Sequence, residues 1–404
     1  MAYPLASILS RFTNTADFFI HSKPVSYQDE RLRVLYIIGK YPEYSETYMH
    51  EEMTRVSKEF DTRITSYLHA VNPRANHLPY ELIEYKDACI NWGDFTLVNT
   101  TFTNKLQVQY LEEMAAVIRK FRPHVLHGHY FATSLIIRKL SDIHGIPFTL
   151  RTHSFDMLQQ DTGKIDALCN AVNSPLCVGI FTYPEFRNTL LQHGINEGKI
   201  FISWPVVNVK RFLNTGKPVR TGQILCCGPC TYKKAHDQFI EFANSMRNSG
   251  LVFNLYTRGN CENRIRKYNA SIGSPVNILY SEPEHMPEVY RHHDWLLYPS
   301  DTNIREVGLP CSIIEAQASG IGVCWQEIPG RRQAQLDFLG GAGFLFKTYD
   351  EARKIITGEY PGEMRQLGYE NCLKCDVELH GKKLASAWNT FRENQGLQDN
   401  VSVP

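Results

Sequence analysis

Apolar, strand-like runs alternate with helix-like segments along most of this chain, and this alternation restricts the folds that it can adopt. The runs 33–38 and 62–67 are rich in aliphatic and β-branched residues, and the segment 47–58 between them has a helical pattern. Strands that alternate with helices pair in parallel and are covered by helices on both faces. The further predicted helices cover 106–121, 131–143, 235–248 and 284–292, and the further strands cover 124–127, 147–151, 223–227, 252–257, 276–280, 294–298, 322–325 and 344–346. The sequence therefore predicts an α/β fold of doubly wound parallel sheets.

The length of the chain predicts two domains, because 404 residues exceed what one hydrophobic core usually serves. Loop-forming residues without apolar periodicity gather before the second run of strands, and we place the linker there. The predicted organisation is a tail or packing helix over 1–30, an N-terminal Rossmann-like domain over 31–205, a linker over 206–220, a C-terminal Rossmann-like domain over 221–378, and a C-terminal helix and tail over 379–404 that packs back on the first domain.

Composition excludes several classes of protein. The chain is 43% hydrophobic and 21% charged, with a net charge of +1, so no general attraction to nucleic acid is expected. No apolar run approaches the roughly 20 residues of a membrane-spanning helix, and the first thirty residues do not have the pattern of a signal peptide. The 11 cysteines, several inside predicted buried strands, are typical of reduced thiols. We predict a cytoplasmic protein, with peripheral contact at a membrane surface left open by the mixed apolar pattern of residues 5–20.

The segment 306–320 carries the most specific chemistry. A glycine/proline loop that contains Gly308, Leu309 and Pro310 follows a predicted strand and leads into a short helix with a carboxylate, Glu315. The unpaired amides at a helix N-terminus bind phosphate, and a carboxylate just beyond them is placed to bind a ribose or sugar hydroxyl. The alternative is a capping box, in which Glu315 bonds back to the helix start at Ser312. The segment suggests a nucleotide-sugar pocket.

Five segments in order resemble the retaining glycosyltransferases of family 4, in particular an exopolysaccharide-type subgroup. They are YPEYSETY at 41–48, HGH at 127–129, THSFD at 152–156, GPCTYKKAH at 228–236 and the 306–320 segment. The resemblance covers roughly residues 33–350. It implies the GT-B fold, two Rossmann-like doubly wound domains facing across a cleft, with the acceptor on the N-terminal domain and the nucleotide sugar on the C-terminal domain.

On the acceptor and cleft side, the resemblance implies that His153 contacts the transferred sugar. The other candidates on this side are Ser45, Glu46, Thr47, His127, His129 and Asp156. Ser45 or Thr47 could instead be an ordinary helix N-cap, and His153 a histidine satisfied at a strand end. The i, i+2 spacing of His127 and His129 also permits a metal pair, but the sequence near them offers no carboxylate or cysteine to complete a set. We therefore predict no metal site.

On the donor side, the resemblance implies that Lys234 neutralises the departing diphosphate and that Glu315 binds the ribose. Electrostatic stabilisation of this kind is usually the largest catalytic term. The lysine pair at the start of the helix 235–248 could instead be a solvated basic pair. The remaining donor-side candidates are Gly228, Lys233, Arg258, Gly308, Leu309 and Pro310, with Glu306 as a further catalytic carboxylate.

Two departures from the family pattern bear on activity. Pro229 stands where the family has a diphosphate-binding arginine, and Val307 stands where it has a glutamate, with Glu306 one residue further away. Arg258, Arg305 and Arg331 are candidates to supply the missing positive charge. A catalytically weak or inactive binding protein on the same fold is therefore the alternative hypothesis.

A competing motif is Cys227-Gly-Pro-Cys230, which matches the C-G-P-C sequence of thioredoxins. It suggests a thiol-disulfide oxidoreductase as a second alternative.

Taken together with the resemblance, the sequence predicts a metal-independent, retaining glycosyltransferase of the hexosyltransferase type that needs no cofactor. Its donor would be a nucleoside-diphosphate sugar, and its acceptor a glycan or lipid-linked glycan in polysaccharide biosynthesis.

Overall fold

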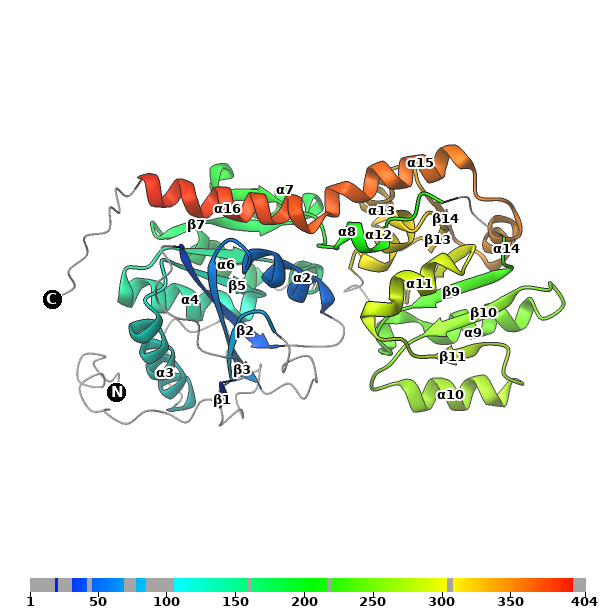
Figure 1. The fold of residues 1–404 in the computed structure, drawn as a ribbon, viewed down its shortest axis with the longest axis horizontal. Helices are drawn as coiled ribbons and strands as arrows, with labels where there is room; N and C mark the ends of the chain where they lie inside the picture. The colour runs from blue at the N-terminus through cyan, green and yellow to red at the C-terminus, as the bar shows by residue number, and fades with distance from the viewer. Residues whose placement is uncertain are drawn as a thin grey trace. The chain divides into compact units, whose positions relative to one another are not determined.

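The computed structural model describes residues 19–20, 31–41, 46–68, 78–84, 105–158, 162–216, 220–303 and 308–394. The described residues divide into two compact units, which are coloured from blue to red along the chain in Figure 1. The N-terminal unit combines Met1–Glu46, Glu52–Ser203 and Gly381–Pro404, and the C-terminal unit combines Thr47–Glu51 and Trp204–His380. The change of unit at Ser203 lies just before the predicted linker, which contains a short helix, α8 (Val209–Phe212).

The N-terminal unit is built on a sheet of eight described strands in the order β1-β4-β3-β2-β5-β6-β7-β8. Every pairing is parallel except that of the edge strand β1 with β4. The strands are β1 (Phe19–Ile20), β2 (Arg33–Lys40), β3 (Asp61–Leu68), β4 (Glu81–Glu84), β5 (Val125–His129), β6 (Phe148–Arg151), β7 (Cys177–Thr182) and β8 (Ile200–Ile202). The order reverses between β2 and β5. In doubly wound sheets, ligands bind at the carboxyl ends of the strands beside this reversal.

The helices of this unit are α3 (Lys105–Phe121), α4 (Phe131–His144), α5 (Ser154–Leu158), α6 (Thr162–Val172) and α7 (Arg187–Gln192), together with the part of α2 (Thr47–Val56) from Glu52 onward. The predicted helix stop at Gly145 is confirmed, because Gly145 has φ 67° and its N–H bonds to the Ser141 carbonyl. The long helix α16 (Val377–Asn394) returns to this unit from Gly381 onward (Figure 1), where Trp388 is fully buried and donates to Thr149 Oγ1.

The C-terminal unit has a six-stranded, all-parallel sheet within its described part, in the order β11-β10-β9-β12-β13-β14. The strands are β9 (Gln223–Cys227), β10 (Val252–Tyr256), β11 (Asn277–Leu279), β12 (Trp295–Tyr298), β13 (Gly322–Gln326) and β14 (Phe344–Phe346). Counted along the chain this is the order 3-2-1-4-5-6 of the dinucleotide-binding Rossmann fold, and its reversal lies between β9 and β12.

The remaining helices of this unit are α9 (His236–Ser245), α10 (Glu262–Ser271), α11 (Met286–Arg291), α12 (Cys311–Ala318), α13 (Arg332–Leu339), α14 (Tyr349–Thr357) and α15 (Gly362–Asn371). A core of Phe239, Phe253, Leu255, Trp295 and neighbouring apolar residues fills the space between the sheet and its helices. Burial on both faces explains why these strands have continuous apolar sequences.

The predicted α/β class with two doubly wound sheets is confirmed, and each predicted strand and helix overlaps an observed one. The predicted tail or packing helix over 1–30 lies mostly outside the described residues, although Phe19–Ile20 forms the edge strand β1. Among the described residues, none of the helices combines the length and the apolar character that crossing a bilayer requires.

Candidate functional site

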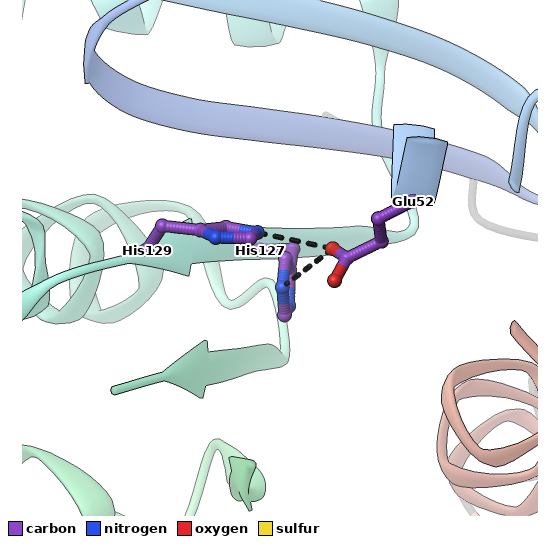
Figure 2. Close-up of side chains that lie close together, drawn as sticks. All are labelled: Glu52, His127 and His129. Carbon is purple, nitrogen blue, oxygen red and sulfur yellow. Dashed lines mark hydrogen bonds and ion pairs between the residues drawn. The ribbon is translucent and has the colours of Figure 1, made fainter. Parts of the chain in front are cut away.

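In the N-terminal unit, a buried carboxylate lies at the carboxyl end of β5, beside the reversal of strand order. Glu52 reaches it from α2, and Figure 2 shows the rings of His127 and His129 directed toward that carboxylate. His129 Nε2 lies 3.0 Å from Glu52 Oε1, and His127 Nε2 lies 3.6 Å from the same oxygen. Arg151, the last residue of β6, donates to Glu52 Oε2 at 3.1 Å. The two charges balance each other, which makes the burial of both tolerable.

His153 is joined to this cluster through His129. The two rings stack at 5.2 Å, and His129 Nδ1 lies 3.0 Å from His153 Nε2. Burial lowers the pKa of His153 well below its usual range, and the nearby His129 and Arg151 lower it further. His153 is therefore a neutral imidazole at physiological pH. Its surroundings suit a hydrogen bond to an uncharged polar group such as a hydroxyl.

The backbone around His153 is fixed by Asp156. Asp156 Oδ2 accepts from the His153 N–H at 3.1 Å, and its other oxygen accepts from the Phe131 N–H at 3.2 Å. The first bond is the reach-back half of a capping box at the start of α5. Asp156 thereby joins the starts of α5 and α4 and holds the backbone of the site in place.

The sequence-based statement that no carboxylate completes a set with His127 and His129 was wrong. Glu52 stands far away in the sequence, and only the packing of α2 over the sheet brings it within 4.8 Å of both imidazoles. His127 Nδ1 also lies 2.6 Å from Thr149 Oγ1. Arg151 holds the carboxylate on its other side, so the cluster as folded is an ion pair with two imidazoles around it.

Of the predicted residues at 45–47, Ser45 lies outside the described part of the chain. The alternative in which Ser45 or Thr47 caps the helix is wrong, because Glu46 occupies the N-cap of α2 and Thr47 is its first residue. Glu46 accepts a hydrogen bond of 2.6 Å from Tyr130 Oη. Tyr130 has φ 70°, which is strained for a tyrosine, and its ring lies 4.4 Å from that of His153.

In the C-terminal unit, Lys234 lies at the reversal of strand order. It is half-buried, and its Nζ donates to Tyr298 Oη at 2.5 Å, at the carboxyl end of β12. Burial lowers the pKa of Lys234 from its usual range. Gly228, which follows β9 with φ 144°, lies in the loop that leads to it. The structure thus places a lysine and a glycine loop where a doubly wound sheet binds phosphate.

The expectation that Lys233 and Lys234 open the helix is corrected. They end a separate 3-10 turn, η4 (Tyr232–Lys234), and α9 begins at His236. Ala235, between η4 and α9, has φ 49°, so the chain changes direction before the helix starts. The helical pattern did not reveal this, because alanine is the residue that most favours a helix.

Glu315 is held by Tyr290, whose Oη donates to Glu315 Oε2 at 2.7 Å. The capping-box alternative is wrong, because Pro310 occupies the N-cap of α12 and Glu315 lies in the second turn. Burial raises the pKa of Glu315 to about 7, although the Tyr290 bond and Arg211 oppose this rise. The half-buried carboxylate is thus poised between its two forms at physiological pH.

Two loops pack against each other beside Gly228. The Cys230 N–H bonds to the Arg258 carbonyl, and Gly259 approaches the Cys230 backbone so closely that a Cβ would lie 2.9 Å from its carbonyl oxygen. The exposed Arg258 guanidinium lies 5.1 Å from the ring centroid of Tyr280. Leu309 and Pro310 are buried before α12 and Gly308 is half-buried, whereas Glu306 lies outside the described residues.

The structure argues against the thiol-disulfide alternative. Cys227 and Cys230 are free and buried. Burial raises the pKa of Cys227 to about 12, and it raises that of Cys230 as well. A redox-active pair needs a lowered thiol pKa, because the thiolate is the reactive species.

Comparison with known proteins identifies the fold. No sequence family and no curated protein matches this chain. Among solved structures, HepE of Anabaena in complex with UDP and glucose aligns with a TM-score of 0.66 at 12% identity, over 89% of this chain and 100% of that chain. The sucrose-phosphate synthase of Thermosynechococcus elongatus gives 0.66 at 13% identity, over 90% and 100%. A glycosyltransferase of Rickettsia africae gives 0.64 at 15% identity, over 91% and 100%.

These likenesses and the two strand orders define the class: the chain has the GT-B fold of glycosyltransferases, with two Rossmann-like units. The predicted fold class is confirmed. At such low identity the likeness establishes the fold and leaves the reaction to be argued from the site. The assignment to the retaining family 4 and to its exopolysaccharide-type subgroup stays a prediction.

Sequence reasoning missed four residues that build the two sites. Glu52 and Arg151 form the buried pair in the N-terminal unit, and Tyr290 and Tyr298 hold Glu315 and Lys234 in the C-terminal unit. Arg151 did carry a signal, since a charged residue at the end of a predicted buried strand requires a partner. Tyr298 ends an apolar strand and Tyr290 lies in the short helix α11, and at both positions a buried ring is the ordinary interpretation.

Proposed function

We propose that this protein is a glycosyltransferase that moves a sugar from a nucleoside-diphosphate sugar to a glycan or lipid-linked acceptor. The single observation that carries the proposal is the position of Lys234. It lies at the strand-order reversal of a Rossmann sheet, beside a glycine loop, in a chain with the GT-B fold. HepE, which shares this fold, has been solved with UDP-glucose.

In this proposal the C-terminal unit binds the donor. Lys234 contacts the diphosphate and stabilises the negative charge that develops when the sugar leaves. Glu315 accepts hydrogen bonds from the ribose hydroxyls, because a carboxylate oxygen is a strong acceptor for a diol. The Gly228 loop lets the backbone approach the phosphates without a side chain in between.

The N-terminal unit binds the acceptor, and His153 contacts a hydroxyl of a sugar. By analogy with the fold's relatives, we propose that the anomeric configuration is retained and that the leaving phosphate assists deprotonation of the acceptor. The reaction would then need no flanking pair of carboxylates. It would also need no metal, because a lysine and the backbone amides neutralise the charge that a divalent cation otherwise neutralises.

The test of this function compares Lys234→Ala with Lys354→Ala, an exposed lysine of α14 in the same unit. Calorimetry with UDP, GDP, ADP and their sugars should identify one nucleotide that binds the unaltered protein. Loss of the ammonium should weaken that binding about tenfold or more, since hydrogen bonds to charged groups contribute about 1.5–3 kcal/mol. Lys354→Ala should bind like the unaltered protein. Equal binding by both variants would refute the role of Lys234.

A non-catalytic nucleotide- or sugar-binding protein is the second candidate, because uncharged Pro229 directly follows Gly228 in the donor loop. Loss of one charged contact to the leaving group costs about 10²-fold or more in rate. Tight nucleotide binding without sugar transfer or donor hydrolysis, across a panel of donors and acceptors, would establish this candidate in place of the first.

A further inference from the structure

Three side chains of the C-terminal unit form a continuous line of hydrogen bonds that ends at Glu315. The Sγ of Cys227, the last residue of β9, lies 3.0 Å from Tyr290 Oη, and Tyr290 Oη lies 2.7 Å from Glu315 Oε2. Tyr290 belongs to α11 and Glu315 to α12. Cys227 and Tyr290 are buried, whereas Glu315 is half-buried. Of the three side chains, Glu315 is therefore the one that a ligand can reach.

The protonation states of the two buried groups fix the direction of both hydrogen bonds. Burial raises the pKa of Cys227 to about 12 and that of Tyr290 well above its usual range. The thiol and the phenol therefore both keep their hydrogens at physiological pH. An ionised carboxylate only accepts hydrogen bonds, so Tyr290 donates to Glu315. The phenol oxygen is then left to accept a hydrogen bond from the Cys227 thiol.

The geometry assigns the two oxygens of the Glu315 carboxylate to different partners. We propose that Tyr290 is a positioning residue that acts through Glu315, where it occupies Oε2 and leaves Oε1 to accept a hydroxyl of the ligand. Among the residues that the structure describes, none donates a hydrogen bond to Oε1. The Tyr290 ring is itself fixed by packing edge-on against Phe212 of α8 at 5.6 Å. The inference rests on the proposed function for the identity of the ligand, a ribose.

The other charges near Glu315 oppose each other. Burial raises the pKa of Glu315 and the Tyr290 bond lowers it, after which Arg211 lowers it and Glu51 raises it. Arg211 and Glu51 form an ion pair of 2.6 Å, so their effects partly cancel. Nearby titratable side chains of β12, α15 and η6 (Cys372–Cys375) bond to other groups: Tyr298 to Lys234, Tyr369 to the Asn214 carbonyl, and Lys374 to the Asp337 and Phe338 carbonyls.

The line of hydrogen bonds also gives Cys227 a role other than redox chemistry. A thiol whose pKa is about 12 does not exchange a proton with a carboxyl group whose pKa is about 7. Hydrogen bonds in a series polarise one another, so the bond from Cys227 makes Tyr290 a better donor to Glu315. Cys227 thus supports the carboxylate through the phenol.

Carbon-13 NMR of the glutamate-labelled full-length protein tests the proposal without any ligand. The carboxyl signal of Glu315, assigned with Glu315→Gln, should titrate at about pH 7 in the unaltered protein. Tyr290→Phe removes the hydroxyl that favours the ionised form. The midpoint should rise by about one pH unit or more, the shift expected when a hydrogen bond to a charged group is lost. An unchanged midpoint in folded Tyr290→Phe would overturn the proposal.

The matched control is Tyr360→Phe. Tyr360 is a buried tyrosine of the same unit, and its Oη donates to the Ala342 and Met364 carbonyls. This variant loses the same atom and a comparable amount of stability, but the midpoint of Glu315 should not move. A rise equal to that of Tyr290→Phe would show that the shift comes from general loosening and would refute the positioning role.

Two cysteine variants decide the proposal if Tyr290→Phe does not fold. Cys227→Ala removes the bond that polarises Tyr290, so the midpoint of Glu315 should rise, by less than the loss of the phenol would cause. Cys227→Ser keeps a donor at this position and should not raise the midpoint. Equal midpoints in the two variants would then overturn the proposal.

Calorimetry tests the part of the inference that concerns the ribose. The probes are the nucleoside diphosphate that binds, among UDP, GDP and ADP, and its 2′,3′-dideoxy form. At pH 7, a rise of about one unit in the midpoint leaves about fivefold less of the ionised carboxylate. Tyr290→Phe should therefore bind the ribonucleotide about fivefold more weakly than the unaltered protein. It should bind the dideoxynucleotide equally well, because that ligand has no hydroxyl for Oε1.

The two experiments separate this inference from the proposed function. Equal weakening of both nucleotides by Tyr290→Phe would overturn the role of Tyr290 in ribose recognition. A raised Glu315 midpoint, together with no binding of any nucleotide or nucleotide sugar to the unaltered protein, would uphold the hold of Tyr290 on Glu315 and refute the proposed function. Nucleotide binding with an unchanged midpoint would support the proposed function and overturn the positioning role.

Discussion

At the scale of single residues, this protein buries charge in two different ways. Glu52 is paired with Arg151 at 3.1 Å. Glu315 accepts a hydrogen bond of 2.7 Å from the neutral Tyr290, and burial raises its pKa to about 7. A paired carboxylate fixes structure, whereas a carboxylate near its midpoint responds to a ligand. The difference is consistent with a structural role for the first and a binding role for the second.

We expect nucleotide-sugar binding to depend on pH through Glu315. The ionised form accepts ribose hydrogen bonds better, so affinity should rise from about pH 6 to about pH 8, across the pKa of about 7. In the protein without ligand, the contribution of Glu315 to folding stability changes with pH in the opposite direction. Stability from the raised pKa is fully present below the ordinary value near 4.5 and is lost as pH rises through about 7.

Calorimetry and thermal unfolding of Glu315→Gln test both statements. The ligand should be a nucleotide sugar, whose phosphates do not titrate in this range. The variant should then lose the part of the pH dependence of affinity, and of stability, that comes from Glu315. A pH dependence of affinity identical to that of the unaltered protein would exclude Glu315 as its source.

At the scale of elements, both candidate sites lie at the carboxyl ends of parallel strands beside a reversal of strand order. Connections on the two sides of a reversal diverge, which leaves room for a ligand there. In the C-terminal unit, the loops after β9 and β10 are fitted to each other at Gly259. The shape of the donor loop thus depends on a neighbouring loop that need not contact the donor.

Gly259→Ala should damage this fit. Gly259 has φ 148°, which L-residues rarely adopt, and the new Cβ would lie 2.9 Å from the Cys230 carbonyl oxygen. A strained backbone of this kind costs about 1–3 kcal/mol. Thermal unfolding should show this loss, and calorimetry should show weaker nucleotide binding.

The control for Gly259→Ala is Gly362→Ala at the start of α15, where no heavy atom of the described residues beyond its own surroundings in the chain lies within 4 Å of the added Cβ. It should be neutral or slightly stabilising, because alanine restricts the unfolded chain. Equal stability of the two variants would contradict the prediction, because it would show that the loop after β10 accommodates the added Cβ without cost.

At the scale of the whole molecule, the last described helix of the chain returns to the N-terminal unit. Helix α16 starts in the C-terminal unit, and its residues from Gly381 onward belong to the N-terminal unit. Trp388 packs edge-on against Tyr36, Phe60 and His127, and its Nε1 donates to Thr149 Oγ1. Helix α16 therefore contributes, through Trp388, to the core around His127.

Trp388→Ala should destabilise the N-terminal unit by about 3–5 kcal/mol, the usual cost of removing a buried tryptophan. Hydrogen exchange should rise in β5 and β6. The strands β9 and β12 should be unaffected, and nucleotide binding should persist. Trp388→Phe, which keeps most of the volume, should show a smaller increase in the same strands. A uniform increase over both units would contradict this assignment.

Prediction from the sequence succeeded where the signal is local. The strand from Val34 to Ile38 and the helix stop at Gly145 depend on nearby residues, and both are observed. The resemblance named His153 and Lys234 as site residues, and the roles that it gives them stay predictions. Glu52 was missed because its partners His129 and Arg151 lie 77 and 99 residues away, and the turn at Lys234 was missed because Ala235 adopts an unusual φ.

By its pattern alone, the sequence determined two α/β units with parallel sheets, because continuous apolar runs must be buried on both faces and helices must cover them. Only the tertiary structure decided which charges meet. Burial removes a carboxylate from water, and the partner that replaces the water is set by packing between distant elements. Arg151 and His129 at Glu52, and Tyr290 at Glu315, are therefore properties of the folded chain.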